Sequence, residues 1–333
     1  MTGKGEKFSS SPVILLCKNV GICYNQNIQT IPEEKDNGLL RSIRRLNKQQ
    51  SAGLAFTASS LISLLFSFIF VIALLAGGVS VGEEKPDWYL YLSFLLPQLA
   101  FLAVACVCFF LVKIPVKEVA GKPSAKYFVL AVLLQFGLLS LSQLNGWFVQ
   151  LFEGIGYVPS PVVIPSTEGF ELVGVMLVVA LLPAVLEELI FRGFVLRGLK
   201  EFGVVFSVLV CGGLFALYHQ NPIQTAYQFC CGAAFALMAF RSGSVFPTML
   251  AHFINNAAIV LVYHFTGVDE YLLPWYVVLL AALCLVGTLA YLFFFDKKEE
   301  KIQSKKPSKK AFFAYAAVGI VVCLINWISA LFS

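Results

Sequence analysis

Six of the ionisable or amide side chains that stand inside strongly apolar segments of the sequence have types and spacing that could do chemistry. They are Glu187, Glu188, Arg192, His219, His252 and Asn256. An ionisable group near the centre of a lipid bilayer costs about 3 kcal/mol or more, so each of these groups needs a partner or a chemical role. We therefore treat the six residues as a candidate site.

Their spacing indicates which of them share a helix face. Glu188 and Arg192 are four residues apart, so on a helix they lie on one side and can neutralise each other. Glu187 lies about 100° further around the same helix and is left without that partner. His252 and Asn256 are also four apart and project to one side. A structural ion pair remains an alternative explanation for Glu188 and Arg192.

These residue types suit the hydrolysis of a peptide bond. Glu187 with His219 can polarise a water molecule, while His252 and Asn256 can donate hydrogen bonds to the oxyanion that develops. Asn255 competes with Asn256 for that last role. No Ser or Cys stands in a recognisable nucleophile setting, so a covalent intermediate is disfavoured.

A metal-dependent reaction is the alternative chemistry. Two histidines and one glutamate can hold zinc, and Glu187, His219 and His252 are the ligands that the sequence offers. The compact motif His-Glu-x-x-His is absent, however. We therefore favour a site that requires no cofactor and keep zinc as the alternative.

The composition defines the kind of element that must position this site. The chain has 333 residues, of which 59% are hydrophobic and 13% charged, and its mean hydropathy is +0.82. This is too little polar surface for a water-soluble globule, so the lipid bilayer is the expected surrounding. Long apolar runs without the alternating pattern of a membrane barrel predict helices. We find no nucleic-acid-binding motif.

Nine apolar segments are long enough to be considered as membrane spans. A hydrocarbon core of about 30 Å needs roughly 20 helical residues. The candidates are Leu54–Val79, Trp88–Val112, Tyr127–Leu151, Phe170–Leu199, Val204–His219, Ile223–Phe240, Val245–Phe265, Leu272–Phe295 and Ala311–Phe332. The fifth and sixth are short, so the sequence predicts an all-α, polytopic transmembrane helical bundle with about eight to nine spans.

The spans and the charges between them give an organisation and a topology. We predict a cytosolic N-terminal tail at residues 1–50, three transmembrane helices in 54–151, an intramembrane catalytic core in 170–265, and C-terminal transmembrane helices with a basic linker in 272–333. With the N-terminus inside, Lys85 is the one basic residue on the outer side, and Arg192 lies within the membrane. This predicts a multi-pass protein of the cell (plasma) membrane with a cytoplasmic N-terminus.

Three motifs in order give the site a resemblance to a known family. They are Glu187-Glu188 with Arg192, Phe215 with His219, and His252 with Asn256. In this respect the sequence resembles the CPBP family, the CAAX prenyl proteases and bacteriocin-processing enzymes that include the type II prenyl endopeptidase. The resemblance covers about residues 170–262.

The resemblance implies a role for each motif residue. Glu187 and His219 would activate the water, His252 and Asn256 would form the oxyanion hole, and Glu188 and Arg192 would organise the site. It implies a peptide or protein substrate, with or without a lipidated C-terminus. The family is described both as metalloproteases and as glutamic proteases, so the resemblance leaves the metal open.

Two other functions were weighed. A bacteriocin-immunity or membrane binding protein could use the same cavity without hydrolysis. A proton-coupled transporter is disfavoured, because such proteins usually show two repeated halves with matching broken helices, and the sequence has no internal repeat.

Overall fold

The computed structural model describes residues 38–79, 85–159, 163–267, 273–296 and 307–332. The chain divides into two units, residues 1–41 and 42–333, and everything below concerns the second. The predicted N-terminal tail lies outside the described residues up to position 37.

All the regular elements of the described residues are helical. They are α1 (Gly38–Arg44), α2 (Lys48–Ala76), α3 (Asp87–Cys106), η2 (Val107–Leu111), α4 (Val116–Ala120), α5 (Ala125–Leu138), η3 (Leu139–Leu141), α6 (Ser142–Glu153), α7 (Glu171–Val175), η4 (Met176–Leu181), α8 (Leu182–Glu188), η5 (Leu189–Val195), α9 (Leu196–Leu199), η6 (Lys200–Phe202), α10 (Val204–Tyr218), α11 (Thr225–Ser242), α12 (Phe246–Thr266), α13 (Trp275–Ala290), η7 (Tyr291–Phe295) and α14 (Lys309–Ala330). An isolated β-bridge joins Gly121 to Ser244. The predicted all-α class is confirmed.

Seven helices in the described part of the chain are long and apolar enough to cross a membrane, so this is an integral membrane protein. They are Lys48–Ala76, Asp87–Leu111, Ala125–Glu153, Glu171–Phe202, Phe246–Thr266, Trp275–Phe295 and Lys309–Ala330. The predicted count of eight to nine is not confirmed. The difference lies in α10 and α11: α10 has 15 residues, about 22 Å of helix at 1.5 Å per residue, and α11 is not among the seven.

The first span begins earlier than predicted, at Lys48 instead of Leu54. Asn47 caps it, since its side chain accepts a hydrogen bond from the Gln50 backbone N–H at 2.9 Å, and the Gln50 side chain accepts one from the Asn47 N–H at 3.0 Å. This capping box satisfies two backbone donors that would otherwise lack partners.

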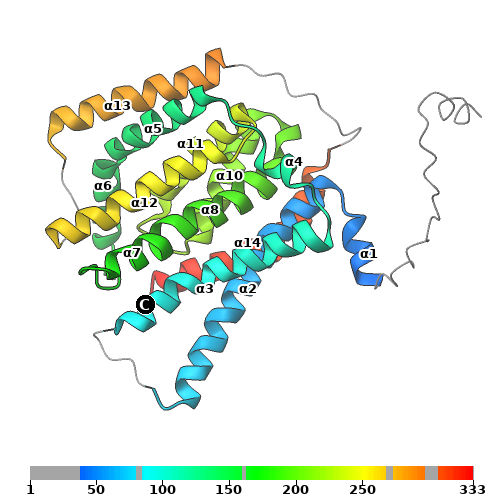
Figure 1. Cartoon of the computed structure of the whole chain (residues 1–333), viewed down its shortest axis with the longest axis horizontal. Coiled ribbons are helices and arrows are strands. Elements are labelled where there is room, and N and C mark those ends of the chain that lie inside the picture. Colours follow the sequence, from blue (N-terminus) through cyan, green and yellow to red (C-terminus); the bar gives the residue numbers. More distant parts are fainter. Residues whose placement is uncertain (1–37, 80–84, 160–162, 268–272, 297–306, 333) are drawn as a thin grey trace, which may run out of the picture. The chain divides into compact units, whose positions relative to one another are not determined.

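The α10–α11 hairpin is the scaffold for the site. A Cβ added at Gly212 would lie 2.8 Å from the backbone nitrogen of Ala233, and one added at Gly232 would lie 3.0 Å from Gly212 Cα. Glycine at both positions therefore lets the two helices pack with their backbones in contact. Figure 1 shows this hairpin beside α8 and α12.

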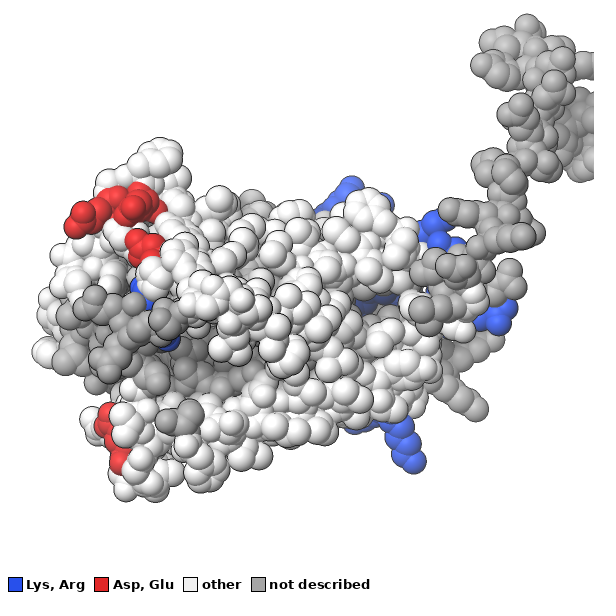
Figure 2. All heavy atoms as spheres, turned by 90° about the horizontal axis from the view of Figure 1, so that it is seen from below, with Lys and Arg blue, Asp and Glu red and all other residues white. Residues whose placement is uncertain are grey.

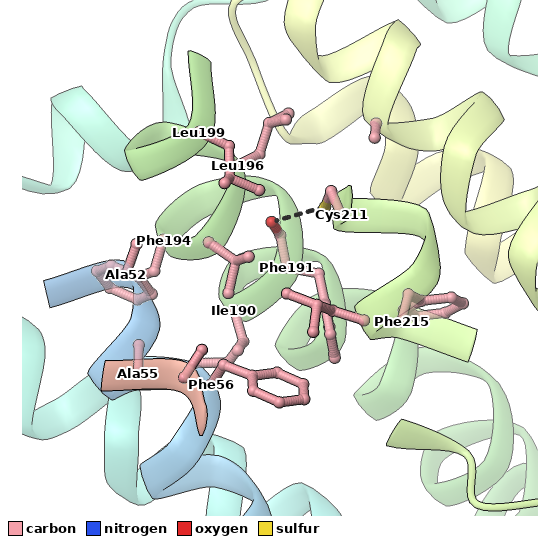
Figure 3. Packing of buried hydrophobic residues seen from close by; sticks show 14 of the residues in the cluster. Ala52, Ala55, Phe56, Ile190, Phe191, Phe194, Leu196, Leu199, Cys211 and Phe215 are labelled. Carbon is pink, nitrogen blue, oxygen red and sulfur yellow. Dashed lines mark hydrogen bonds between the residues drawn. The ribbon is translucent and has the colours of Figure 1, made fainter. Parts of the chain in front are cut away.

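An aromatic cluster packs against the next part of the site span, Glu171–Phe202. The ring of Phe191 meets Phe56 from α2, Phe101 from α3 and Phe215 from α10 at centroid distances of 6.3, 6.1 and 5.1 Å. In Figure 3 the Cys211 thiol also donates to the Phe191 carbonyl, at 3.4 Å. The segment just after Glu188 is thus fixed against three other helices.

Candidate active site

A cavity of about 410 Å³ lies between α3, α8, α10, α11 and α12. Four of the predicted site residues line it: Glu187, His219, His252 and Asn256. Gln98 and Asn255 line it as well. The structure therefore brings together Glu187 and Asn256, which are 69 positions apart in the sequence. Glu188 and Arg192 are buried and do not line this cavity.

Glu188 and Arg192 form the ion pair expected from their spacing. Arg192 Nη1 lies 2.7 Å from Glu188 Oε1, and both side chains are fully buried. Arg192 Nη2 also donates to the carbonyl of Gly232 at 3.2 Å, and its guanidinium stacks 4.3 Å from the centroid of Phe215. The pair thus links the site span to the α10–α11 hairpin.

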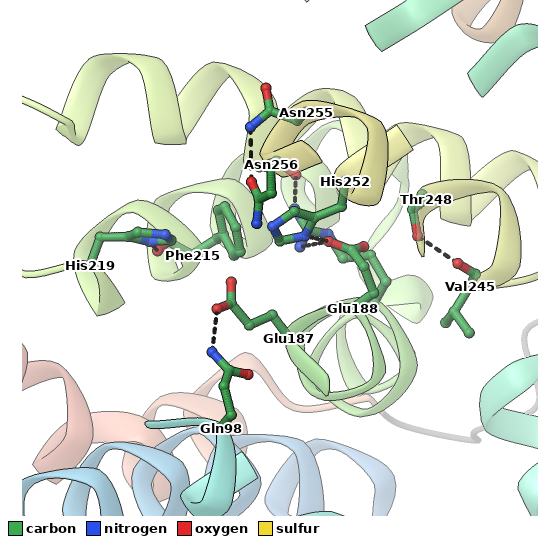
Figure 4. A network of polar contacts seen from close by, with 12 residues as sticks. Gln98, Glu187, Glu188, Phe215, His219, Val245, Thr248, His252, Asn255 and Asn256 are labelled. Carbon is green, nitrogen blue, oxygen red and sulfur yellow. Dashed lines mark hydrogen bonds and ion pairs between the residues drawn. The ribbon is translucent and has the colours of Figure 1, made fainter. Parts of the chain in front are cut away.

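The same carboxylate oxygen orients His252. His252 Nδ1 lies 2.9 Å from Glu188 Oε1, and since a carboxylate can only accept, Nδ1 carries the proton of this bond. Nε2 is then the ring nitrogen available to the cavity, and in Figure 4 it faces the side on which Asn256 and Glu187 lie. Glu188 is therefore a shared anchor for Arg192 and His252.

Gln98 holds the second carboxylate, Glu187. Its Nε2 donates to Glu187 Oε1 at 3.0 Å, and both residues are buried. The other carboxylate oxygen of Glu187 points into the space between Phe215 and His252 (Figure 4). Sequence reasoning missed Gln98, although a lone amide in the apolar stretch of α3 was a signal that could have found it.

His219 lies at the tip of the α10–α11 hairpin. Its Nδ1 is 2.8 Å from the carbonyl of Phe215, which can only accept, so the neutral ring has its lone pair on Nε2. Among the described residues, no hydrogen bond joins His219 to Glu187 directly, yet both line one cavity. The cavity can therefore accommodate a water molecule or a substrate group between His219 and Glu187.

The last span, α14, holds the turn that follows His219. Gln220 adopts the left-handed conformation with φ 53°, which is unfavourable for a residue other than glycine. Its Oε1 accepts a hydrogen bond from Asn326 at 2.8 Å, and Trp327 donates to Thr225 at 2.8 Å. The sequence did not predict this role for the C-terminal helix.

Asn256 is held by a backbone carbonyl of the site span. Its Nδ2 donates to Val179 O at 3.2 Å. Pro183 stands four residues after Val179 and has no N–H, so the usual helical donor to that carbonyl is missing. The intramembrane proline therefore makes an acceptor available to Asn256.

The alternative zinc set does not fit this arrangement. In the described ranges, no group of three His, Cys, Asp or Glu side chains is placed so that it could hold a metal ion. Glu187, His219 and His252 line one cavity, and each imidazole has Nδ1 engaged and Nε2 free, as zinc-binding histidines do, but the three side chains are not clustered closely enough to hold the ion. We therefore derive no chemical step through a metal.

The geometry defines a class: a helical integral membrane protein with a carboxylate, two imidazoles and a carboxamide around a buried cavity. Residues 169–258 match the family described as "Type II CAAX prenyl endopeptidase Rce1-like". This match, over 90 of the 333 residues, supports the resemblance to the CPBP family that the three motifs indicate. No curated protein and no solved structure matches it. The matched segment contains all three motifs but not Gln98 or α14.

Proposed function

We propose that the protein is an intramembrane endopeptidase of the CAAX type that hydrolyses a peptide bond with a water molecule activated by Glu187 and His219. The observation that carries the proposal is the convergence of Glu187, His219, His252 and Asn256 on one cavity within the segment that matches the family. The favoured reaction is of the glutamic type and requires no cofactor.

The proposed attack begins with water between Glu187 and His219. One proton of the water passes to the pair formed by the Glu187 carboxylate and His219 Nε2. At the same time the water oxygen bonds to the carbonyl carbon of the substrate. The electron pair of the carbonyl moves to its oxygen. His252 Nε2–H and an Asn256 Nδ2–H donate to this oxyanion.

Collapse of the intermediate completes the proposed reaction. The carbon–nitrogen bond breaks as the carbonyl re-forms, and the stored proton passes to the leaving nitrogen, which gives a carboxylic acid and an amine; the acid then transfers its proton to the amine, which leaves a carboxylate and an ammonium group. Donation by both ring nitrogens of His252 requires its imidazolium form, and Glu188 Oε1 lies 2.9 Å from Nδ1 to accept one of the two bonds. Arg192 holds Glu188 in place through the contact of 2.7 Å between Nη1 and Oε1.

The proposed substrate is a peptide or protein, and the cavity wall suits one that carries a lipidated C-terminus. Apolar side chains make up much of the wall: Phe94, Ile164, Phe215, Phe235 and Ile259. Such a surface would accept a hydrocarbon chain beside a peptide segment. The protein would act in the cell membrane with its N-terminus in the cytoplasm.

The test is cleavage by the purified full-length protein in nanodiscs, with prenylated and unmodified C-terminal peptides. Wild type would be compared with Glu187→Gln and His219→Ala, and with Glu171→Gln as a control for an exposed carboxylate outside the cavity. We expect cleavage that both site variants abolish, that the control retains and that a chelator does not affect. Peptide binding that survives in Glu187→Gln, with no cleavage by folded wild type, would favour the immunity or binding alternative.

A further inference from the structure

Asn256 ends a chain of hydrogen-bonded side chains that reaches the cavity from two other helices. Asn255 Oδ1 accepts from Gln135 Nε2 at 2.8 Å and from the hydroxyl of Tyr227 at 3.0 Å. Asn255 Nδ2 then donates to Asn256 Oδ1 at 3.0 Å. Gln135 belongs to α5 and Tyr227 to α11, so three helices meet in this relay.

The Val179 carbonyl fixes the direction of every bond in the relay. A backbone carbonyl can only accept, so Asn256 must turn its Nδ2 toward Val179 and its oxygen toward Asn255. Asn255 must then present Nδ2 to Asn256 and its oxygen to the two donors, Gln135 and Tyr227. Rotation of either asparagine amide by 180° would place an oxygen against an oxygen on one side of that amide and an N–H against a donor on the other.

This fixed orientation matters because Asn256 Nδ2 carries two hydrogens. One is donated to Val179 O, and the other remains for a group in the cavity that Asn256 lines. Without the bond from Asn255, the Asn256 amide would be held by the Val179 carbonyl alone, and its second N–H would no longer be fixed in direction by two contacts. Gln135 is 2% exposed, and its Nε2 bond to Asn255 is the contact that satisfies this buried amide, since its Oε1 has no partner among the described residues.

We propose that Asn255, Tyr227 and Gln135 are positioning residues that hold Asn256 with an N–H directed at the developing oxyanion. The inference rests on the function proposed above and deepens it. It assigns Asn255 to orientation instead of direct contact with the oxyanion. None of the three residues belongs to the family motifs, and Gln135 lies outside the matched segment.

The experiment is a double-mutant cycle on peptide cleavage by the full-length protein in nanodiscs. Asn255→Leu removes the amide in the wild-type and Asn256→Ala backgrounds, and Gln150→Leu on the exposed face of α6 is the matched control. We expect Asn255→Leu to lower kcat about 10-fold with KM little changed, because loss of one oxyanion donor outright costs about 100-fold or more. In the Asn256→Ala background the same change should add less than about 2-fold.

A second variant guards against loss of the fold. Tyr227→Phe with Gln135→Leu removes both donors to Asn255 and should also lower kcat, while Tyr276→Phe, on the exposed face of α13, should not. Equal losses of kcat in both Asn256 backgrounds, or changes confined to KM, would overturn the relay while leaving the proposed function standing. A folded wild-type protein that cleaves no peptide would overturn both.

Discussion

Gln98 fixes one oxygen of the Glu187 carboxylate. It occupies Glu187 Oε1 at 3.0 Å, and the other oxygen faces the cavity (Figure 4). A carboxylate fixed at one oxygen presents the other with a defined direction, which a general base needs for efficient proton transfer.

Replacement of Gln98 therefore tests the orientation of the base. We expect Gln98→Leu to lower kcat about 10-fold, a part of the 100-fold or more that general base catalysis contributes. Gln98→Glu should lower it further, because a second carboxylate would repel Glu187. Steady-state kinetics on peptide cleavage would measure this, beside Gln150→Leu. Activity of Gln98→Leu equal to that of the control would contradict the assignment.

The Glu188–Arg192 pair predicts an asymmetry in stability. Arg192→Met leaves the fully buried carboxylate of Glu188 with His252 as its remaining partner, so we expect destabilisation by about 3 kcal/mol. Arg192→Met with Glu188→Leu removes both charges and should be less destabilised than Arg192→Met alone. Denaturant unfolding in detergent would compare the variants. If the double variant unfolded at a lower denaturant concentration than Arg192→Met alone, the unpaired buried charge would not be the cause of the destabilisation.

The sequence was informative about the site wherever spacing carried a signal. Residues four apart, such as Glu188 and Arg192, share a helix face whatever the position of the helix in the fold. The structure contains the ion pair that this spacing predicts. Gln98, Gln135 and Asn326 are single amides in apolar helices. Their partners are distant in sequence, so only the packing of the helices reveals what they hold. The catalytic roles remain predictions.

At the scale of elements, two π-helical segments flank the short helix that carries Glu187. These are η4 and η5, on either side of α8. A π-turn widens the helix by one residue and is common at functional sites. The Val179 carbonyl that binds Asn256 lies in η4, and Arg192 lies in η5. Both irregular segments thus place groups that organise the cavity.

Pro183 gives a prediction at this scale. Pro183→Ala restores an N–H that can donate to Val179 O and compete with Asn256, so we expect kcat to fall several-fold. The helix itself should gain stability, because proline in a helix interior costs about 3 kcal/mol relative to alanine. Cleavage kinetics and thermal unfolding would be measured on the same sample. Loss of both activity and stability would instead indicate a structural proline.

The elements themselves were predicted with uneven success. Long apolar runs identified the spans from α2 to α14, since length and hydropathy are enough for helices that cross a bilayer. The hairpin α10–α11 was harder, because 15 residues in α10 and a polar turn at its tip are consistent with either a short span or a buried segment. The π-helical segments leave no mark in hydropathy, since they depend on which backbone groups bond.

At the scale of the molecule, charge separates along the helix axes. Figure 2 shows Asp and Glu side chains gathered at one end, and most of the visible Lys and Arg toward the other. The described helix ends agree: Asp87, Glu153 and Glu171 stand at one set of ends, and Lys48 and Lys117 belong to the other. Because cytoplasmic loops carry an excess of basic residues, we predict that the basic end faces the cytoplasm.

That assignment predicts which side of the cell membrane each end faces. In intact cells, a membrane-impermeant maleimide should label Glu153→Cys, whereas Lys117→Cys should react only after permeabilisation. Both positions are exposed in the structure, and the wild-type chain, which already has nine cysteines, provides the background. The reverse pattern would place the N-terminus outside. Glu187 stands 16 residues after Glu171 and 15 before Phe202, about 24 and 22 Å along the helix, so it lies near the middle of its span, and maleimide labelling of cavity positions from each side would decide by which leaflet a substrate enters.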